Sequence, residues 1–243
     1  IEAELAKPGT IGVGYNSIRF DDEVTRFLFW RNLIDPYARE WQNQCGRWDL
    51  LDVVRTAYAL RPEGIQWPTK AEGGTSFKLT DLTAANGLVH EAAHDALSDV
   101  RATIALARLI KTAQPRLFDF CLGLHKKDRV ATELGLPTTP RNARPFWHVS
   151  GMFPADRGCL ALMWPLAMHP KNKNELIAWD LAFDPRELRH ALPMGHQHRL
   201  DAVAAGLDRH GEAVRLAVHR RARLVDGQAE DHLAARRGVL VQV

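Results

Sequence analysis

An alternation of strand-like and helix-like segments between residues 10 and 112 limits most strongly which folds are open to this chain. Residues 10–16 read as a short strand that ends in turn residues. The acidic run from Asp21 then opens a helix, because acidic side chains suit the positive N-terminus of a helix. Further helices are expected from about Asp49 to Leu60 and from Asp95, as its cap, to about Lys111. This alternation predicts an α/β fold.

Apolar side chains at helical spacing predict which faces of these helices are buried. In the helix from Asp21, the predicted apolar face consists of Val24, Phe27 and Leu28. The apolar side of the helix from Asp95 is predicted to be formed by Leu97, Val100, Ile104 and Leu109.

The pattern of residue types along the chain changes twice in its second half. From about Phe146, short apolar runs lie between Gly, Pro and Asn turns, which predicts a small β domain. Residues 191–243 contain no Phe, Tyr, Trp, Ile, Lys or Asn, so we expect either a frameshifted, non-native tail or a basic helical or disordered extension, with little function. The predicted domains are therefore 1–113, 114–190 and an atypical tail, 191–243.

Composition restricts the function only loosely. The chain is 46% hydrophobic and 25% charged, and no apolar run approaches the roughly 20 residues of a membrane span, so no membrane partner is expected. Three cysteines without a C-x-x-C pair suggest neither a disulfide framework nor a zinc ribbon, so a reducing, cytoplasmic setting is expected. A net charge of +3 permits a polyanionic partner without demanding one. The first methionine is Met152, so we expect a processed, trimmed or incomplete chain.

Two groups of residues have the chemistry of a metal-dependent site. Asp21 follows a strand and a turn at the mouth of a helix, where its carboxylate could reach a metal at the strand edge, although an acid there is most often only a cap. His94 and Asp99 are five residues apart and can converge only if His94 lies in the loop before the helix. That arrangement suits a mobile base beside a fixed metal ligand.

A competing motif overlaps the second group. His90-Glu-Ala-Ala-His94 is a formal H-E-x-x-H zinc-protease pattern. Gly87 interrupts the helix that such a motif needs, and Leu97 stands where the metzincin extension has Gly. We therefore keep a zinc metalloprotease only as an alternative.

Longer strings of this sequence resemble one family. Gly14-Tyr-Asn-Ser-Ile-Arg-Phe-Asp-Asp-Glu-Val-Thr-Arg26, Arg47-Trp-Asp-Leu-Leu-Asp-Val-Val-Arg55 and His148-Val-Ser-Gly-Met-Phe153 are similar to the exodeoxyribonuclease I family of DEDDh exonucleases, from about residue 10 to about 185. The resemblance implies a ribonuclease-H-like exonuclease fold followed by a small Src-homology-3-like β domain. It also implies 3′→5′ hydrolysis of single-stranded DNA to 5′-mononucleotides in repair and recombination.

The resemblance also implies roles for single residues. Asp21 and Asp99 would be ligands of two Mg²⁺ ions held by four acidic residues, and His94 would be the general base. The family's Asp-x-Glu strand is not found, because Asp21-x-Glu23 lies on a helix start, where the two side chains diverge. We expect that strand to precede residue 1, which would leave the first strands of the fold missing and this chain inactive or nearly so.

The resemblance further implies contacts with single-stranded DNA, for which cations and aromatic rings are suited. The residues are Arg26, Tyr37, Trp41, Arg55, Arg61, Lys78, Lys127 and Asn174. A single-strand-binding protein is the implied protein partner, and a monomer is expected. A catalytically dead fragment that still binds single-stranded DNA stays open as an alternative to the nuclease.

Overall fold

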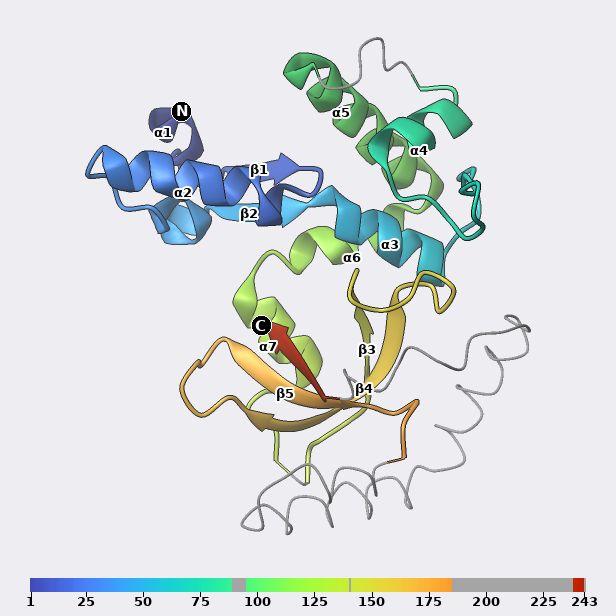
Figure 1. Ribbon diagram of the computed structural model, residues 1–243. Helices are drawn as coiled ribbons and strands as arrows, with labels where there is room; N and C mark the ends of the chain where they lie inside the picture. The colour runs from blue at the N-terminus through green and yellow to red at the C-terminus, as the bar shows by residue number, and fades with distance from the viewer. Residues whose placement is uncertain (89–94, 140, 185–237, 243) are drawn as a thin grey trace. The chain divides into compact units, whose positions relative to one another are not determined.

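The computed structural model describes residues 1–88, 95–139, 141–184 and 238–242 (Figure 1). It divides into two compact units. The first contains residues 1–126 and 150–159, and the second contains residues 127–149 and 160–243. Within the described residues, no helix is long and apolar enough to cross a membrane.

The first unit is built around a pair of parallel strands, β1 (Ile11–Gly14) and β2 (Gly46–Asp49), in which Ile11 is opposite Gly46. The connection between them carries α2 (Asp21–Arg31), as expected for a parallel crossover. The remaining short elements of this region are α1 (Glu2–Leu5), η1 (Ser17–Arg19), η2 (Ala38–Glu40) and η3 (Gln42–Gln44).

Helices complete the first unit after β2. They are α3 (Leu50–Leu60), α4 (Leu79–Ala85), α5 (Ala96–Ala113) and α6 (Pro115–Gly123). Their core includes Leu50, Leu82, Leu106 and Ile110, each with no exposed surface. The predicted α/β alternation and the Asp95 cap are confirmed, since the Asp95 carboxylate accepts a hydrogen bond from Ser98 N–H.

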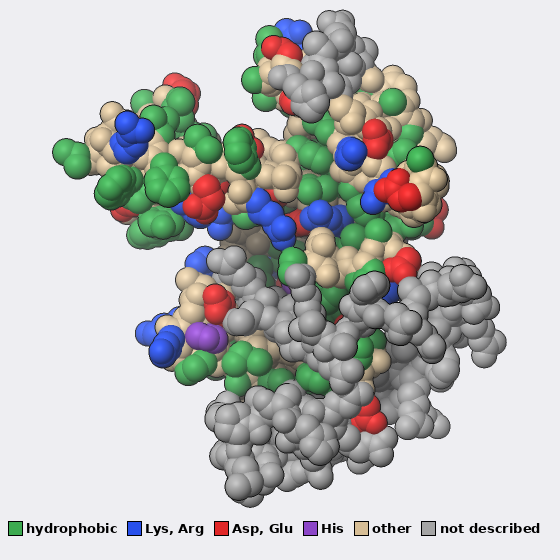
Figure 2. Space-filling model, viewed as in Figure 1, with side chains coloured by type: hydrophobic (Ala, Val, Ile, Leu, Met, Phe, Trp, Pro, Cys, Tyr) green, Lys and Arg blue, Asp and Glu red, His purple; other side chains and the backbone are tan. Residues whose placement is uncertain are grey.

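The predicted apolar face of α2 is wrong. Val24, Phe27 and Leu28 are 53%, 65% and 43% exposed, and hydrophobic side chains lie open on the surface of the first unit around α2 (Figure 2). The buried residues of this helix are Phe29 and Asp22. An acidic residue is buried there because two arginines neutralise it, a pairing that helical periodicity cannot predict.

The predicted apolar side of α5 is also largely wrong. Leu97, Val100 and Ile104 are exposed, and the buried face consists of Ala102, Thr103, Leu106 and Ile110. Of the predicted set, only Leu109 packs against the core. The stripe of Val100 and Ile104 instead lines a cavity of the first unit.

The second unit contains α7 (Lys127–Leu134) and an antiparallel sheet of order β3-β4-β5-β6. The strands are β3 (Phe146–Val149), β4 (Leu160–Met168), β5 (Glu175–Asp180) and β6 (Gly238–Gln242). Pro165 is tolerated in a central strand because the register of β4 shifts beside it. This sheet confirms the predicted small β domain.

Described elements follow both predicted domain boundaries, helix α6 the first and strand β6 the second. Helix α6, which follows the predicted boundary at residue 113, packs against α3 and α5 through Phe118 and Cys121 in the first unit. Residues 238–242 of the predicted atypical tail form β6 and pair with β5. The domain limits at 113/114 and 190/191 stay predictions.

Candidate functional site

A cavity of about 1480 Å³ in the first unit brings together residues from distant parts of the sequence. Asp21, at the start of α2, and Asp99, in the first turn of α5, both line it. Arg55 of α3 and Lys78, the residue before α4, line the same cavity. Two predicted metal ligands and two predicted DNA contacts therefore share one cavity.

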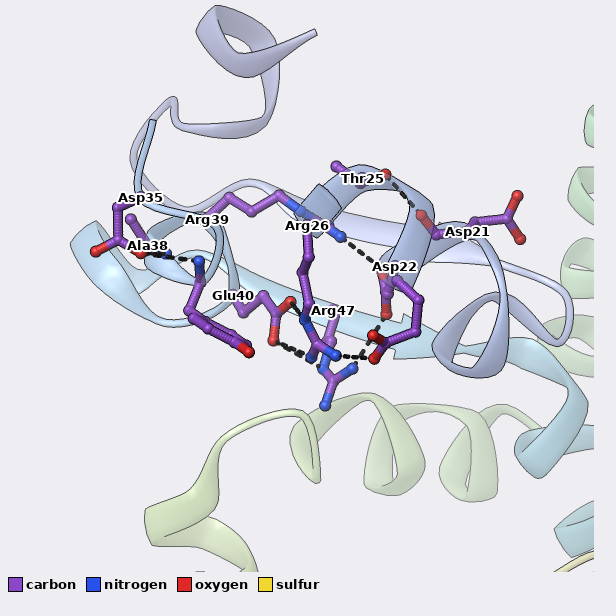
Figure 3. A network of polar contacts seen from close by, with 11 residues as sticks. Asp21, Asp22, Thr25, Arg26, Asp35, Ala38, Arg39, Glu40 and Arg47 are labelled. Atoms are coloured by element: carbon purple, nitrogen blue, oxygen red, sulfur yellow. Dashed lines mark hydrogen bonds and ion pairs between the residues drawn. The ribbon is translucent and has the colours of Figure 1, made fainter. Parts of the chain in front are cut away.

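Asp21 is held by its helix while its side chain remains open to the cavity. The residue is exposed, and its backbone carbonyl accepts a hydrogen bond of 2.7 Å from Thr25 Oγ1. Figure 3 shows the Asp21 side chain turned away from the ion pairs of its neighbour Asp22. The Asp21 carboxylate is thus available to a ligand of the cavity.

Asp99 is fixed by the cap of α5. Its backbone N–H donates to Asp95 O at 2.9 Å, and its carbonyl accepts from Thr103 Oγ1 at 2.8 Å. Because Asp95 caps the helix, Asp99 lies in its first turn, where the helix dipole favours a negative charge. His94, the predicted base, lies outside the described residues, as do His90 and Glu91 of the zinc-protease alternative.

The donor types at the cavity fit a hard divalent cation. Magnesium prefers carboxylate and water oxygens and is commonly held by one or two carboxylates together with substrate phosphates. Asp21 and Asp99 supply two such carboxylates. Asp22 also lines the cavity, but its carboxylate is ion-paired with Arg39 and Arg47. In the part of the chain that the structure describes, no three His, Cys, Asp or Glu side chains form a metal-ion group.

Asp49, which the sequence predicts only as the start of a helix, supports the site from behind. Its carboxylate accepts hydrogen bonds from the backbone N–H groups of Asn16 (2.8 Å), Ile18 (3.2 Å) and Leu51 (3.0 Å). The side chain therefore caps α3 and also holds the turn that leads to Asp21. Desolvation by burial raises the pKa of Asp49, and the backbone hydrogen bonds oppose that rise. The sequence predicts Asp49 at the start of a helix, but it contains no local signal for the hydrogen bonds to Asn16 and Ile18.

Tyr15 forms another wall of the cavity. Its hydroxyl donates to Phe77 O at 2.5 Å, next to Lys78. Burial raises the pKa of Tyr15 above its ordinary value, because desolvation disfavours the phenolate. This hydrogen bond links the end of β1 to the segment that presents Lys78.

The other predicted DNA contacts in the first unit lie outside the cavity lining. Tyr37 and Trp41 are 55% and 63% exposed. Arg26 forms a two-point contact with Glu40, at 2.7 and 2.8 Å, and its guanidinium lies 5.0 Å from the centre of the Tyr37 ring. The Glu40 hydrogen bond is the main reason why the pKa of Arg26 is raised. Arg61 is exposed after α3 and donates to Leu60 O.

Arg55 has a more confined position than an isolated surface cation. Its Nη1 donates to Asp52 Oδ1 at 2.8 Å, and its Nη2 lies 2.6 Å from the position of a Cβ on Gly151. A side chain at residue 151 would therefore displace the guanidinium. Lys127 and Asn174 are exposed residues of the second unit. The DNA-binding roles of all eight residues stay predictions.

Comparison with known proteins identifies both units. A family model described as "Exonuclease" matches residues 1–107, and one described as "Exonuclease I SH3-like domain" matches residues 125–196. These matches confirm the predicted fold, an exonuclease domain of the ribonuclease-H-like type followed by a small Src-homology-3-like β domain.

Curated relatives agree with the family models. Exodeoxyribonuclease I of Escherichia coli (strain K12) is 53% identical over 184 residues, which are 76% of this chain and 38% of that protein. The Haemophilus influenzae exodeoxyribonuclease I is 49% identical over 184 residues, again 76% of this chain and 38% of the relative. The chain thus spans well under half the length of these relatives.

Solved structures extend the comparison to the fold. E. coli Exonuclease I in complex with a dA16 oligonucleotide matches with a TM-score of 0.73 and 50% identity, covering 77% of this chain and 39% of that one. An ExoI/SSB-Ct complex matches with a TM-score of 0.77 and 42% identity, covering 99% and 46% of the two chains. Its identity to the curated relatives and its match to their solved structures show that the chain belongs to the exodeoxyribonuclease I family.

Proposed function

We propose that this chain contributes to a 3′→5′ exonuclease that hydrolyses single-stranded DNA to 5′-mononucleotides with the help of Mg²⁺, two ions in the complete site. The observation that carries the proposal is the shared cavity, in which Asp21 and Asp99 face the same space as Arg55 and Lys78. The family assignment and the relatives bound to oligonucleotides support it.

In the proposed hydrolysis, different residues bind the metal ions, bind the phosphates and accept the proton. A bound divalent ion supplies a Lewis acid and a water of lowered pKa for attack on phosphorus. Asp21 and Asp99 offer carboxylate oxygens that would hold such ions at the cavity wall. Arg55 and Lys78 offer positive charge to the phosphates on either side of the scissile bond. His94, outside the described residues, is the proposed acceptor of the water proton.

Outside the cavity, the exposed rings of Tyr37 and Trp41 suit the unpaired bases of a single strand, because every base offers a face for stacking. Lys127 and Asn174 offer further polar contacts on the second unit. A single-strand-binding protein as partner and a role in repair and recombination follow from the family and stay predictions.

One observation favours a second function. Three acidic residues, Asp21, Asp22 and Asp99, line the described cavity, and Asp22 is ion-paired with two arginines. No described strand carries an Asp-x-Glu pair, whereas the proposed mechanism uses four metal-binding acids. We therefore also propose that the 243 residues by themselves bind single-stranded DNA but hydrolyse it slowly.

Separate measurements of binding and cleavage test both proposals. We expect the purified chain to bind a fluorescent dT oligonucleotide more tightly than the corresponding duplex. Release of mononucleotides from its 3′ end in Mg²⁺ should be far below that of a full-length relative. Substantial release that is lost in both Asp21→Asn and Asp99→Asn would support the nuclease and overturn the binding-only function. Absence of oligonucleotide binding would overturn both.

Metal analysis tests the zinc-protease alternative directly. After dialysis against a metal-free buffer, the proposed magnesium site should retain little metal, because Mg²⁺ is bound through few protein ligands and exchanges readily. Stoichiometric zinc that is lost in His90→Ala would favour the protease instead.

A further inference from the structure

Next to the candidate site, five charged side chains form a connected set of ion pairs, the α2 network: Asp22, Arg26, Arg39, Glu40 and Arg47 (Figure 3). Two of these residues lie on α2, two on η2, and Arg47 lies on strand β2. The network therefore joins the helix that carries Asp21 to the sheet of the first unit.

Asp22 is the most buried carboxylate of this network. Arg39 Nη2 donates to Asp22 Oδ1 at 2.6 Å, and Arg47 Nη1 donates to Asp22 Oδ2 at 3.3 Å. The exposed fractions of the Asp22 and Arg39 side chains are 8% and 5%. Both carboxylate oxygens are thus held, which fixes the rotation of the first turn of α2 and not only its distance from the sheet.

The rotation matters because Asp21 is the next residue. Successive residues of a helix point about 100° apart, so one acid can face the arginines while the other faces the cavity. That division is observed: both acids line the cavity, but Asp22 is buried in its ion pairs, whereas Asp21 is exposed and turned away from them. A turn of the helix that released Asp22 would also move the Asp21 carboxylate from its place.

We propose that Asp22, clamped by Arg39 and Arg47, is a positioning residue that sets the direction of the Asp21 carboxylate toward a divalent ion. This inference rests on the proposed function. Side chains that orient a metal ligand from behind commonly change metal affinity by roughly 10–100-fold when they are substituted. The role of Asp22 is then directional and separate from its contribution to folding.

The test compares two substitutions that each remove one negative charge from the first turn of α2. Asp22→Asn breaks the clamp, and Glu23→Gln is its control, because among the described residues Glu23 forms an ion pair with Arg26 alone, at the exposed end of the network. In the full chain, Mn²⁺ affinity is measured by electron paramagnetic resonance, and Mn²⁺ broadening of the Asp21 amide resonance reports where the ion binds. We expect Asp22→Asn to lower the affinity about tenfold and Glu23→Gln to change it less than twofold.

A double variant separates the orientation of the Asp21 carboxylate from the stability of the fold. Breaking a buried pair from one side leaves an uncompensated charge, whereas replacing both partners by apolar residues is often neutral or stabilising. Asp22→Leu/Arg39→Leu should therefore keep the thermal midpoint of the chain and still lose Mn²⁺ affinity. Affinity equal to that of the unsubstituted chain in this double variant would overturn the positioning role.

Amide hydrogen exchange without metal keeps the two proposals distinguishable. The Val24 N–H, which donates to Phe20 O at 3.0 Å, reports the first turn of α2 and should exchange faster in Asp22→Asn than in Glu23→Gln. Unchanged exchange would overturn the clamp even where the metal binds. Faster exchange in a chain whose Asp21 resonance never responds to Mn²⁺ would support the clamp and overturn the metal role of Asp21, and with it the proposed function.

Discussion

The Asp49 carboxylate lies 2.8 Å from the backbone nitrogen of Asn16, a residue 33 positions earlier in the chain. Asn16 has a φ of 60°, in the left-handed region that few residues other than glycine and asparagine adopt, and the Asp49 carboxylate holds its N–H there. Gly14 adds a steric condition, because a Cβ there would lie 2.5 Å from the Ser17 Cβ. The path of the chain from β1 to Asp21 is thus set by a side chain of β2.

Replacing Asp49 should cost more than replacing an ordinary helix cap. Asp49→Ala removes the cap of α3 and two bonds to the turn, for an expected loss of about 2–3 kcal/mol in the free energy of unfolding. Asp95→Ala is the matched control, since Asp95 caps α5 through one exposed bond, and it should cost about 1 kcal/mol. Urea unfolding measures both, and equal losses would contradict a role for Asp49 beyond capping.

Two positions of α5 that are two residues apart should differ clearly in their contribution to stability, because one lies in the core of the first unit and the other does not. Leu106 is fully buried, and Leu106→Ala should cost about 2–5 kcal/mol through lost transfer energy and an unfilled cavity. Ile104 is 46% exposed, so Ile104→Ala should cost less than about 1 kcal/mol. Thermal unfolding of the two variants checks the assignment of the buried face, which would be wrong if the order were reversed.

Aromatic stacking should be specific to the proposed contact surface. Trp41→Ala is expected to weaken binding of a dT oligonucleotide by about 1–3 kcal/mol, because it removes one stacking surface. Trp30 is comparably exposed, at 66% against 63%, and is not a proposed contact, so Trp30→Ala should leave the affinity nearly unchanged. Fluorescence anisotropy at fixed salt compares the two, and equal effects would remove Trp41 from the proposed interface.

A contact between Lys78 and a phosphate should be detectable in the salt dependence of the affinity for single-stranded DNA. A cation that contacts one phosphate of a single strand contributes about 0.7 to the slope of log affinity against log salt concentration. Lys78→Ala should lower the slope by about that amount, since Lys78 lines the cavity. The control is Lys7→Ala, because Lys7 is paired with Glu4 on the surface. An unchanged slope in Lys78→Ala would exclude a phosphate contact.

Acidification should weaken the second unit through His148. Desolvation lowers the pKa of His148 from 6.5 to about 4. The folded protein therefore binds this proton less readily than the unfolded chain, so the contribution to stability is complete above pH 6.5. It is lost as the pH falls from 6.5 toward 4, by at most about 3 kcal/mol. Urea unfolding at pH 7 and pH 4.5 should show a smaller difference in His148→Gln, and an identical difference would contradict the shift.

The sequence alone determined the alternation of strand and helix and where several helices begin. Acidic residues and caps marked α2 and α5, and the short apolar runs from about Phe146 marked the strands of the β domain. These signals are local, since capping, turn formation and strand alternation depend on near neighbours in the chain. Asp21 and Asp99 were likewise selected from motifs and resemblance, and both line the cavity.

Tertiary structure alone decided which sides of those elements are buried. Periodicity pointed to Val24 and Val100 as core residues, yet Asp22 is buried on α2 and Val100 faces the cavity on α5. Asp22 can be buried because cations from other elements reach its carboxylate, Arg39 from η2 and Arg47 from β2. Such pairings join residues far apart in the chain, so no local pattern of the sequence contains them.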